Sequence, residues 1–426
     1  MVADTDMVKT IMIKEFYSCF TNRRETKKDL SGPFVDAVAT VKDERWKRIR
    51  GVISPLFTSG RLKQIFPIAE RYASRLVDHL KKTDLKKPLQ VKEVLGPYNM
   101  DVIISASFSV EIDSINNPQD PFVIHLKNFF QFSFFSPVLV ITALFPFAER
   151  ILGKMGFRMF SKTSMDFFYT FLRKIKDQHH AEKNGRMDFL QLMIRGQMSD
   201  DKAEETSGDR TAKGLTDHEI LSQSFSFILG GYETTSNTLT FLMYNLATNP
   251  NALRKLVEEI DITFPNNAPV TYEKLMDLEY LDMVMNESQR LLPTAPRTMR
   301  ACKKTVEVNG VIIPKDTVVG IPIYVLHHDP QHWTSPEEFR PERFRKENKG
   351  DINPYAFLPF GLGPRNCIGM RFALMVMKLV VVKLLQNFQL ETCKETQIPI
   401  ELDVMYRPKV PVTLNFVPRS VGEKDK

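Results

Sequence analysis

One cysteine near the end of the chain has the surroundings that a reactive thiolate needs. Cys367 lies in the stretch Phe360–Gly369, which reads FGLGPRNCIG, and a long apolar run that predicts a helix follows it. A helix N-terminus offers unpaired backbone amides and positive potential, and both keep a thiolate ionised. The glycines around Cys367 let the backbone fold closely round the sulfur and let a flat group lie against the main chain.

The arginine beside this cysteine suggests what the flat group is. Arg365 can bind a carboxylate through two hydrogen bonds, as a haem propionate would require. Most free cysteines are small buried hydrophobes, and this interpretation applies to Cys19, Cys302 and Cys393. Around Cys367, however, the pattern F-G-x-G-x-R-x-C-x-G is complete, and no Lys-Ser/Thr follows it as a phosphate loop would need. The loop therefore predicts a haem iron held by a single axial cysteinate.

Composition places the chain among folded globular proteins. Its 426 residues are 43% hydrophobic and 26% charged, which is enough for a sizeable core. Four scattered cysteines form no disulfide framework and no C-x-x-C pair, which fits a reducing compartment and argues against covalent haem attachment. The net charge of +7 permits an acidic partner or an anionic membrane surface without requiring either.

Helical patterning dominates the chain. Apolar residues at three- and four-residue spacing predict a helix over 61–81, and Thr216 with Glu219 predicts a capping box that opens a helix lasting to Asn249-Pro250. Strands are few, and the best is a hairpin in Thr305–Ile323 around an Asn-Gly turn. We therefore expect one domain over residues 1–426, mainly α with small β-sheets.

The long helix contains a weak spot, FILGGYETTSNT. Two interior glycines cost about 1 kcal/mol each relative to alanine, so something should compensate for them. Gly230 and Thr234 share a helix face, and the Thr234 hydroxyl can compete for the Gly230 carbonyl. A groove without side chains, next to this hydroxyl and the Glu233 carboxylate, would suit dioxygen and a proton relay. The alternative is a tolerated glycine kink in a packed helix.

With these motifs the chain resembles the cytochrome P450 family, and PFGLGPRNCIGMRFAL is similar to its vertebrate 3A type. The resemblance runs from the first residues to about residue 416. It implies the P450 fold, haem b with the Cys367 thiolate as axial ligand, and monooxygenation of lipophilic substrates such as steroids and xenobiotics. It also implies electrons from NADPH through a flavoprotein reductase, with cytochrome b5 as a further partner. The implied location is the cytosolic face of the endoplasmic reticulum membrane with peripheral membrane contact, and no nucleic acid is expected as a partner.

The resemblance also assigns roles to individual residues. Thr234 would hydrogen-bond the bound dioxygen and Glu233 would deliver protons. Glu287 and Arg290, which share a helical face, would form a buried structural triad with Arg343 of FRPERF. The implied haem-contacting residues are Cys367, Arg365, Phe360, Trp46, Arg50, Arg300 and Arg23. The implied substrate-pocket residues are Ala39, Phe227, Leu229, Thr294, Ala295 and Met405.

Two stretches keep two interpretations each. The phenylalanine-rich region 122–169, with PVLVITALFPF inside it, is either ordinary core or the roof of a substrate pocket that rests in the membrane interface. The basic residues Lys42, Arg45, Lys47 and Arg48 are either a solvated face or a docking site for an acidic reductase.

The start of the chain departs from the family pattern. MVADTDMVKTIMIKEF contains no apolar span of about 20 residues, whereas enzymes of this kind begin with an anchor helix, a hinge and the first strands of a small sheet. We expect a truncated isoform, a partial gene model or a fragment. Two alternative functions therefore stay open. They are a haem-thiolate isomerase or peroxide-using enzyme, which keeps the cysteine loop without an electron partner, and an inactive fragment.

Overall fold

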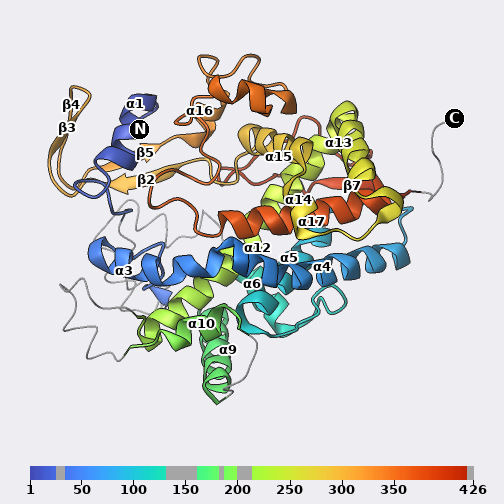
Figure 1. Cartoon of the computed structure of the whole chain (residues 1–426), viewed down its shortest axis with the longest axis horizontal. Helices are drawn as coiled ribbons and strands as arrows, with labels where there is room; N and C mark the ends of the chain where they lie inside the picture. The colour runs from blue at the N-terminus through green and yellow to red at the C-terminus, as the bar shows by residue number, and fades with distance from the viewer. Residues whose placement is uncertain (25–33, 131–160, 182–186, 199–213, 420–426) are drawn as a thin grey trace. The chain divides into compact units, whose positions relative to one another are not determined.

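The computed structural model describes five stretches of the chain (Figure 1). The described residues are 1–24, 34–130, 161–181, 187–198 and 214–419. The stretch PVLVITALFPF and five of the phenylalanines expected near it lie outside these ranges, namely Phe132, Phe134, Phe135, Phe145 and Phe147.

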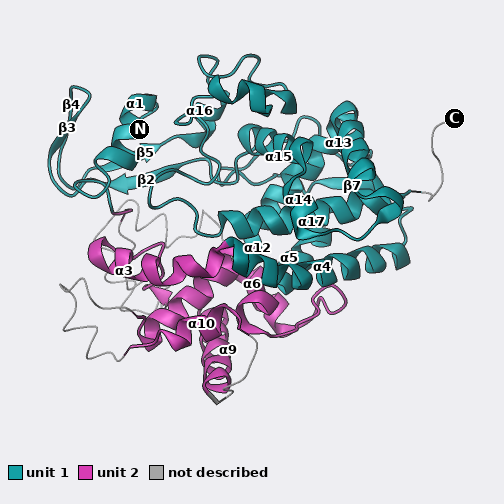
Figure 2. Cartoon of the chain, in the orientation of Figure 1, with its two compact units in different colours: residues 1–21, 59–102, 232–426 teal, residues 22–58, 103–231 magenta. Residues whose placement is uncertain are grey.

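Two compact units divide the chain, and Figure 2 colours them separately. Unit 1 comprises Met1–Thr21, Ser59–Val102 and Tyr232–Lys426, and unit 2 comprises Asn22–Thr58 and Ile103–Gly231. Two long helices, α5 (Val91–Phe108) and α12 (Asp217–Thr248), contribute residues to both units.

Unit 2 is helical and has an aromatic core. Phe225 of α12 stacks on Phe34, with ring centroids 3.9 Å apart, and meets Phe129 edge to face at 5.3 Å. Such ring pairs add to the free energy gained from burying the rings. The other helices of this unit are α3 (Asp43–Ile53), η3 (Ser54–Phe57), α6 (Pro121–Phe130), α9 (Lys162–Ala181) and α10 (Phe189–Arg195).

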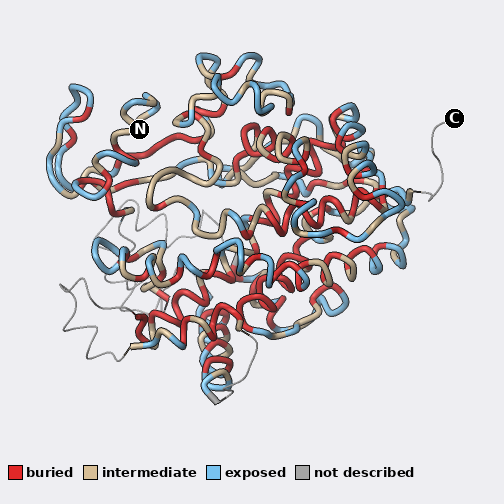
Figure 3. Tube along the Cα trace, viewed as in Figure 1, coloured by how far each residue is buried: buried red, intermediate tan, exposed pale blue. Residues whose placement is uncertain are grey.

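Unit 1 is built around α17 (Met370–Asn387), which packs along α4 (Ser59–Lys82). The expected helix over 61–81 is thereby confirmed. Two thirds of the residues of α17 are buried (Figure 3), although the helix carries two lysines. Lys378 pairs with Asp282 at 2.8 Å and Lys383 pairs with Glu70 at 2.6 Å, so neither ammonium group is buried without an opposite charge.

The remaining helices of unit 1 are short. They are α1 (Thr5–Lys9), η1 (Thr10–Lys14), α13 (Pro250–Thr263), η4 (Pro265–Asn267), α14 (Tyr272–Met276), α15 (Glu279–Leu291), α16 (Ile323–His328), η5 (Pro341–Phe344) and η6 (Lys346–Gly350). None of the described helices is both long and apolar enough to cross a membrane.

The strands of unit 1 form three small antiparallel sheets. The predicted hairpin is confirmed: β3 (Val306–Val308) pairs with β4 (Val311–Ile313), and both turn residues, Asn309 and Gly310, have positive φ. The other sheets pair β2 (Thr298–Ala301) with β5 (Val318–Ile321), and β7 (Thr413–Pro418) with both β1 (Leu89–Gln90) and β6 (Phe388–Thr392). The predicted class, mainly α with small sheets, is therefore correct.

Helix α12 starts and stops where the sequence predicts. Thr216 Oγ1 accepts the Glu219 backbone N–H at 3.3 Å, and Glu219 Oε2 accepts the Thr216 N–H at 3.1 Å, so the capping box is present. The helix runs unbroken through its two glycines. A Cβ on Gly231 would lie 2.7 Å from Ile103 of α5, so the missing side chain allows the two helices to pack closely.

Candidate active site

The loop around Cys367 is a tight turn that ends on a helix. The Cys367 N–H donates to the Phe360 carbonyl at 2.9 Å, and the Asn366 N–H donates to the Gly363 carbonyl at 3.0 Å. Helix α17 begins three residues after the cysteine, at Met370, as the apolar run predicts. Cys367 is exposed, so the turn leaves the thiol accessible, whereas Arg365 of the same turn is buried.

Two glycines of this turn have positive φ for different reasons. A Cβ on Gly361 (φ 74°) would lie 3.8 Å from the Asn366 Cα, an ordinary contact, so the requirement for glycine is conformational only. Gly363 (φ 73°) faces the carbonyl of Met12 on η1, and a Cβ there would overlap that oxygen. Met12 belongs to a buried apolar cluster with Leu358, and Leu362 packs against that cluster. The cysteine loop is therefore seated on the first helical segment of the chain.

The three residues expected to form a charge triad are in contact. Glu287 of α15 is fully buried and receives both Nε and Nη2 of Arg290 at 2.8 Å. Arg343 of η5 donates its Nε to the same carboxylate at 3.1 Å, as does the Arg340 backbone N–H at 2.9 Å. Four donors therefore surround one buried carboxylate, which is the arrangement that makes a buried charge tolerable.

A histidine that sequence reasoning missed connects this triad to the cysteine loop. The carbonyl of His327, on α16, accepts Nη1 of Arg290 at 2.9 Å, and its ring Nε2 accepts the Leu358 N–H at 2.8 Å. Its Nδ1 lies 3.2 Å from the Gln289 carbonyl, which it can reach only as a donor. Burial lowers the pKa of His327 to about 3, so the ring is neutral in this role. No motif marks this residue, because its partners are remote in sequence.

One face of α12 is exposed although most of the helix is buried. Gly230 and Thr234, four residues apart, are both exposed, and no atom lies within 4 Å of a Cβ built on Gly230. One turn later the Thr238 hydroxyl lies 2.7 Å from that of Thr294. Gly230 and Thr234 therefore form an exposed stripe on one face of α12, and the groove for dioxygen beside this stripe stays a prediction.

The Glu233 carboxylate has partners that the sequence did not reveal. Lys92 of α5 donates its Nζ to Glu233 Oε1 at 2.7 Å, and Asn237 donates its Nδ2 to the same oxygen at 3.1 Å. The Glu233 side chain retains 15% exposure, so the pair lies near solvent. Its partner comes from a helix some 140 residues earlier, and no local pattern relates the two positions.

The residues expected to bind haem propionates belong to both units. In unit 1, Arg365 is buried in the cysteine loop and Arg300 is buried on β2, where its Nη1 donates to the Met299 carbonyl at 2.9 Å. In unit 2, Trp46 is buried on α3, while Arg50 on the same helix and Arg23 are half-buried. Phe360 is half-buried at the start of the cysteine turn.

The expected pocket residues differ in burial. Phe227 is buried in unit 2, where its ring packs on Phe57 at 5.6 Å and on Phe189 at 5.9 Å, so the structure gives it a core position. Ala39 is exposed and Leu229 half-buried in the same unit. In unit 1, Thr294 is half-buried, and Ala295 and Met405 are exposed.

The basic segment of α3 is only partly a solvated face. Arg45 pairs with Asp36 and with Glu219, both at 2.8 Å, and Arg48 pairs with Glu219 at 2.6 Å. Lys42 and Lys47 are exposed. Lys47 also lies 4.0 Å from the Glu44 carboxylate, so three of the four cationic residues pair with carboxylates of unit 2 itself.

The donor set at the cysteine loop fits a haem with one thiolate ligand. The turn offers a single accessible thiol, and two buried arginines of the same unit, Arg300 and Arg365, suit the propionates. Within the described ranges, no group of three or more His, Cys, Asp or Glu side chains could hold a metal ion.

Comparison with known proteins decides the family. The cytochrome P450 family model matches residues 1–416. The chain belongs to the cytochrome P450 family. It is 53% identical to cytochrome P450 3A40 of Oryzias latipes over 99% of this chain and 83% of that protein. It is 52% identical to cytochrome P450 3A27 of Oncorhynchus mykiss (98% and 80%) and 51% identical to cytochrome P450 3A2 of Rattus norvegicus (98% and 82%). P450 membership makes the chain a haem-thiolate oxidoreductase of the monooxygenase class.

The two glycines of the cysteine turn should respond differently to alanine. Gly361→Ala should cost about 1–2 kcal/mol of stability through its positive φ alone. Gly363→Ala should cost more and reduce haem retention, because the new methyl group overlaps the Met12 carbonyl. Thermal unfolding and the haem-to-protein absorbance ratio measure both effects, and equal losses in the two variants would contradict this account.

Removing the buried carboxylate should be severe. Glu287→Gln is expected to lower the free energy of unfolding by about 3–5 kcal/mol, because two buried guanidinium groups lose their counter-charge. Glu273→Gln, which breaks the exposed pair with Lys63, is the control and should leave the unfolding midpoint near that of wild type. Urea unfolding of wild type and both variants measures the free energies. A loss of stability in Glu287→Gln no larger than that in Glu273→Gln would refute the structural role of the triad.

His327 should make the protein less stable in mild acid. Its folded pKa lies below the ordinary value of 6.5, so between pH 6.5 and about 3 the unfolded chain binds a proton that the folded chain excludes. Stability should fall by about 1.4 kcal/mol per pH unit from this group as the pH drops below 6.5. His327→Gln should lack that part of the slope in urea unfolding at pH 7, 6 and 5. Parallel slopes would count against the neutral-histidine role.

Proposed function

We propose that this chain oxidises lipophilic small molecules, steroids and foreign compounds among them, with dioxygen and with electrons from NADPH through a flavoprotein reductase. The observation that carries the proposal is the accessible thiol of Cys367 in a glycine turn directly before α17. A thiolate at a helix N-terminus stays ionised, as an axial ligand must.

The haem would be held by the cysteine loop of unit 1. Cys367 would supply the sulfur ligand, and Arg365 and Arg300 would supply buried cations for the propionates. The further contacts are assigned to Trp46, Arg50, Arg23 and Phe360. When bound, the haem provides the oxidation of substrate, and its thiolate ligand favours O–O cleavage. The protein contributes orientation and control of protons.

Proton control is assigned to the exposed stripe of α12. The Thr234 hydroxyl lies on a face with no side chain at Gly230, so it can donate a hydrogen bond to a small ligand there. Glu233 is its neighbour in sequence and keeps contact with solvent, and Lys92 holds its carboxylate. A carboxylate in this position can take a proton from water and return it toward Thr234. The triad of Glu287, Arg290 and Arg343 is assigned a structural role.

The substrate and partners follow from the same proposal. Ala39, Leu229, Thr294, Ala295 and Met405 are assigned to the substrate pocket, together with Phe227 if its ring leaves the core cluster. The electron partners would be NADPH–cytochrome P450 reductase and cytochrome b5. Lys42, directly before α3, and Lys47 on α3 are exposed cations that could steer an acidic partner. The proposed location is the cytosolic face of the endoplasmic reticulum membrane.

Carbon monoxide tests the site directly. The purified, dithionite-reduced protein should show the strongly red-shifted Soret band of a thiolate-ligated haem on addition of carbon monoxide, and Cys367→Ser should abolish it. Cys393→Ser is the matched control, because that thiol hydrogen-bonds Thr396 and the Thr413 carbonyl at the end of a strand. A histidine-like band, or no haem at all, would refute the proposal. Turnover with peroxide but not with NADPH and reductase would support the peroxide-using class instead.

A further inference from the structure

A buried glutamine near the start of α12 holds the main chain of a segment almost 190 residues earlier. Gln223 is fully buried, and its side-chain amide makes contacts on both ends. Its Oε1 accepts the Val38 N–H at 2.7 Å, and its Nε2 donates to the Asp36 carbonyl at 2.7 Å. The planar Gln223 amide therefore hydrogen-bonds the main chain of residues 36–38 as a neighbouring β-strand would, through one backbone donor and one backbone acceptor.

The segment that Gln223 holds, residues 35–41, is a compact turn. Thr40 donates its hydroxyl to the Val35 carbonyl at 2.6 Å and to the Ala37 carbonyl at 2.9 Å, and the Val41 N–H also donates to Ala37. The turn leaves Ala39 exposed at its tip. Its shape is thus determined locally, while its attachment to the rest of unit 2 depends on groups outside it.

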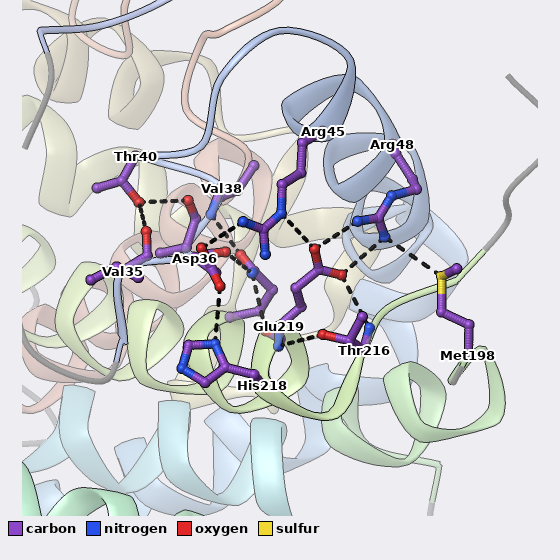
Figure 4. A network of polar contacts seen from close by, with 12 residues as sticks. Val35, Asp36, Val38, Thr40, Arg45, Arg48, Met198, Thr216, His218 and Glu219 are labelled. Atoms are coloured by element: carbon purple, nitrogen blue, oxygen red, sulfur yellow. Dashed lines mark hydrogen bonds and ion pairs between the residues drawn. The ribbon is translucent and has the colours of Figure 1, made fainter. Parts of the chain in front are cut away.

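Ion pairs reinforce that attachment on one side of the turn (Figure 4). Asp36 receives Arg45 at 2.8 Å and His218 of α12 at 3.0 Å. Arg45 also pairs with Glu219, which receives Arg48 as well. Burial alone would raise the pKa of Asp36, but the hydrogen bonds from His218 and Arg45 lower it to about 2, so the carboxylate stays charged.

The two kinds of contact do different work. The ion pairs of Asp36 and Arg45 are partly exposed, so solvent and salt weaken them. The Gln223 side chain is fully buried, so leaving its amide without a hydrogen-bond partner would cost free energy. This cost favours the one position of the turn in which both hydrogen bonds form. The glutamine is therefore the group that determines where the turn sits on α12.

We propose that Gln223 is a positioning residue for substrate binding, which fixes the turn 35–41, and with it Ala39, against the first turns of α12. This inference rests on the proposed function, in which Ala39 lines the substrate pocket. Gln223 itself lies in the core of unit 2 and does not touch the substrate. Its effect is to keep one wall of the pocket in a single conformation, so that bulky ligands meet an ordered surface.

The test compares near-isosteric variants of the haem-loaded protein. Gln223→Met keeps the volume and removes both hydrogen bonds, and Gln223→Asn keeps an amide that is too short to span Val38 and Asp36. Ser222→Ala is the control, because Ser222 is an equally buried neighbour on α12 whose hydroxyl has no hydrogen-bond partner. The first readout is hydrogen–deuterium exchange at the Val38 amide, and the second is azole binding to the haem followed by the Soret shift.

Exchange at Val38 should become about 10- to 100-fold faster in both Gln223 variants and stay unchanged in Ser222→Ala. The dissociation constant of 4-phenylimidazole should rise about 3- to 10-fold in the Gln223 variants, while that of imidazole, which needs no ordered wall, stays constant. Unchanged Val38 exchange would overturn the inference, and so would fast exchange with unaltered 4-phenylimidazole binding. Failure of the proposed function would give a different result. The wild-type protein would then lack the red-shifted Soret band with carbon monoxide, while the Gln223 variants would still show faster exchange at the Val38 amide.

Discussion

The buried carboxylate of Glu287 is the charge around which the cysteine loop is organised. A carboxylate with no exposure needs its negative charge neutralised and its oxygen atoms hydrogen-bonded. Arg290, Arg343 and the backbone of Arg340 meet that need, and they come from a helix and from a loop fifty residues later. The two arginines that neutralise Glu287 also donate to backbone carbonyls, including that of His327. The pairing with one carboxylate therefore holds several loops in place.

The order imposed by Glu287 reaches the thiol through neutral groups. His327 accepts the Leu358 N–H, and Leu358 lies two residues before the turn that holds Cys367. On its other side the turn meets Met12, where only glycine fits at position 363. The loop that carries the Cys367 thiol is therefore supported from two directions, by His327 and by Met12.

Sequence patterns predicted those features whose partners are close in sequence. The capping box at Thr216, the Asn309-Gly310 hairpin and the turn before α17 are all local, and each is present in the structure. The P450 class, mainly α with small sheets, was predicted from the same patterns and the resemblance. The contact between Glu287 and Arg343 was reached only through the family resemblance, since spacing alone relates Glu287 to Arg290.

Sequence reasoning failed where a side chain finds its partner across the fold. His327 carries no periodic signal, and the contact of Lys92 with Glu233 joins helices that are far apart in the chain. The resemblance assigns Phe227 to a substrate pocket, and this assignment stays a prediction. The packing of its ring on Phe57 and Phe189 could not be read from the sequence. Packing of this kind depends on which helices meet, and a one-dimensional pattern does not contain that information.

Two arginines of α3 form ion pairs with one buried carboxylate, and this pairing changes how the basic cluster is interpreted. In the sequence, Lys42, Arg45, Lys47 and Arg48 form a basic run that looks like a surface for an acidic partner. The Glu219 carboxylate is almost fully buried and already accepts one hydrogen bond in the capping box of α12, which leaves three of its four lone pairs. A buried anion at a helix start attracts the nearest guanidinium groups more strongly than water does, because they can bind it in pairs. Arg45 and Arg48 are thereby drawn into the structure of unit 2, so the basic run is in part an internal feature of this unit.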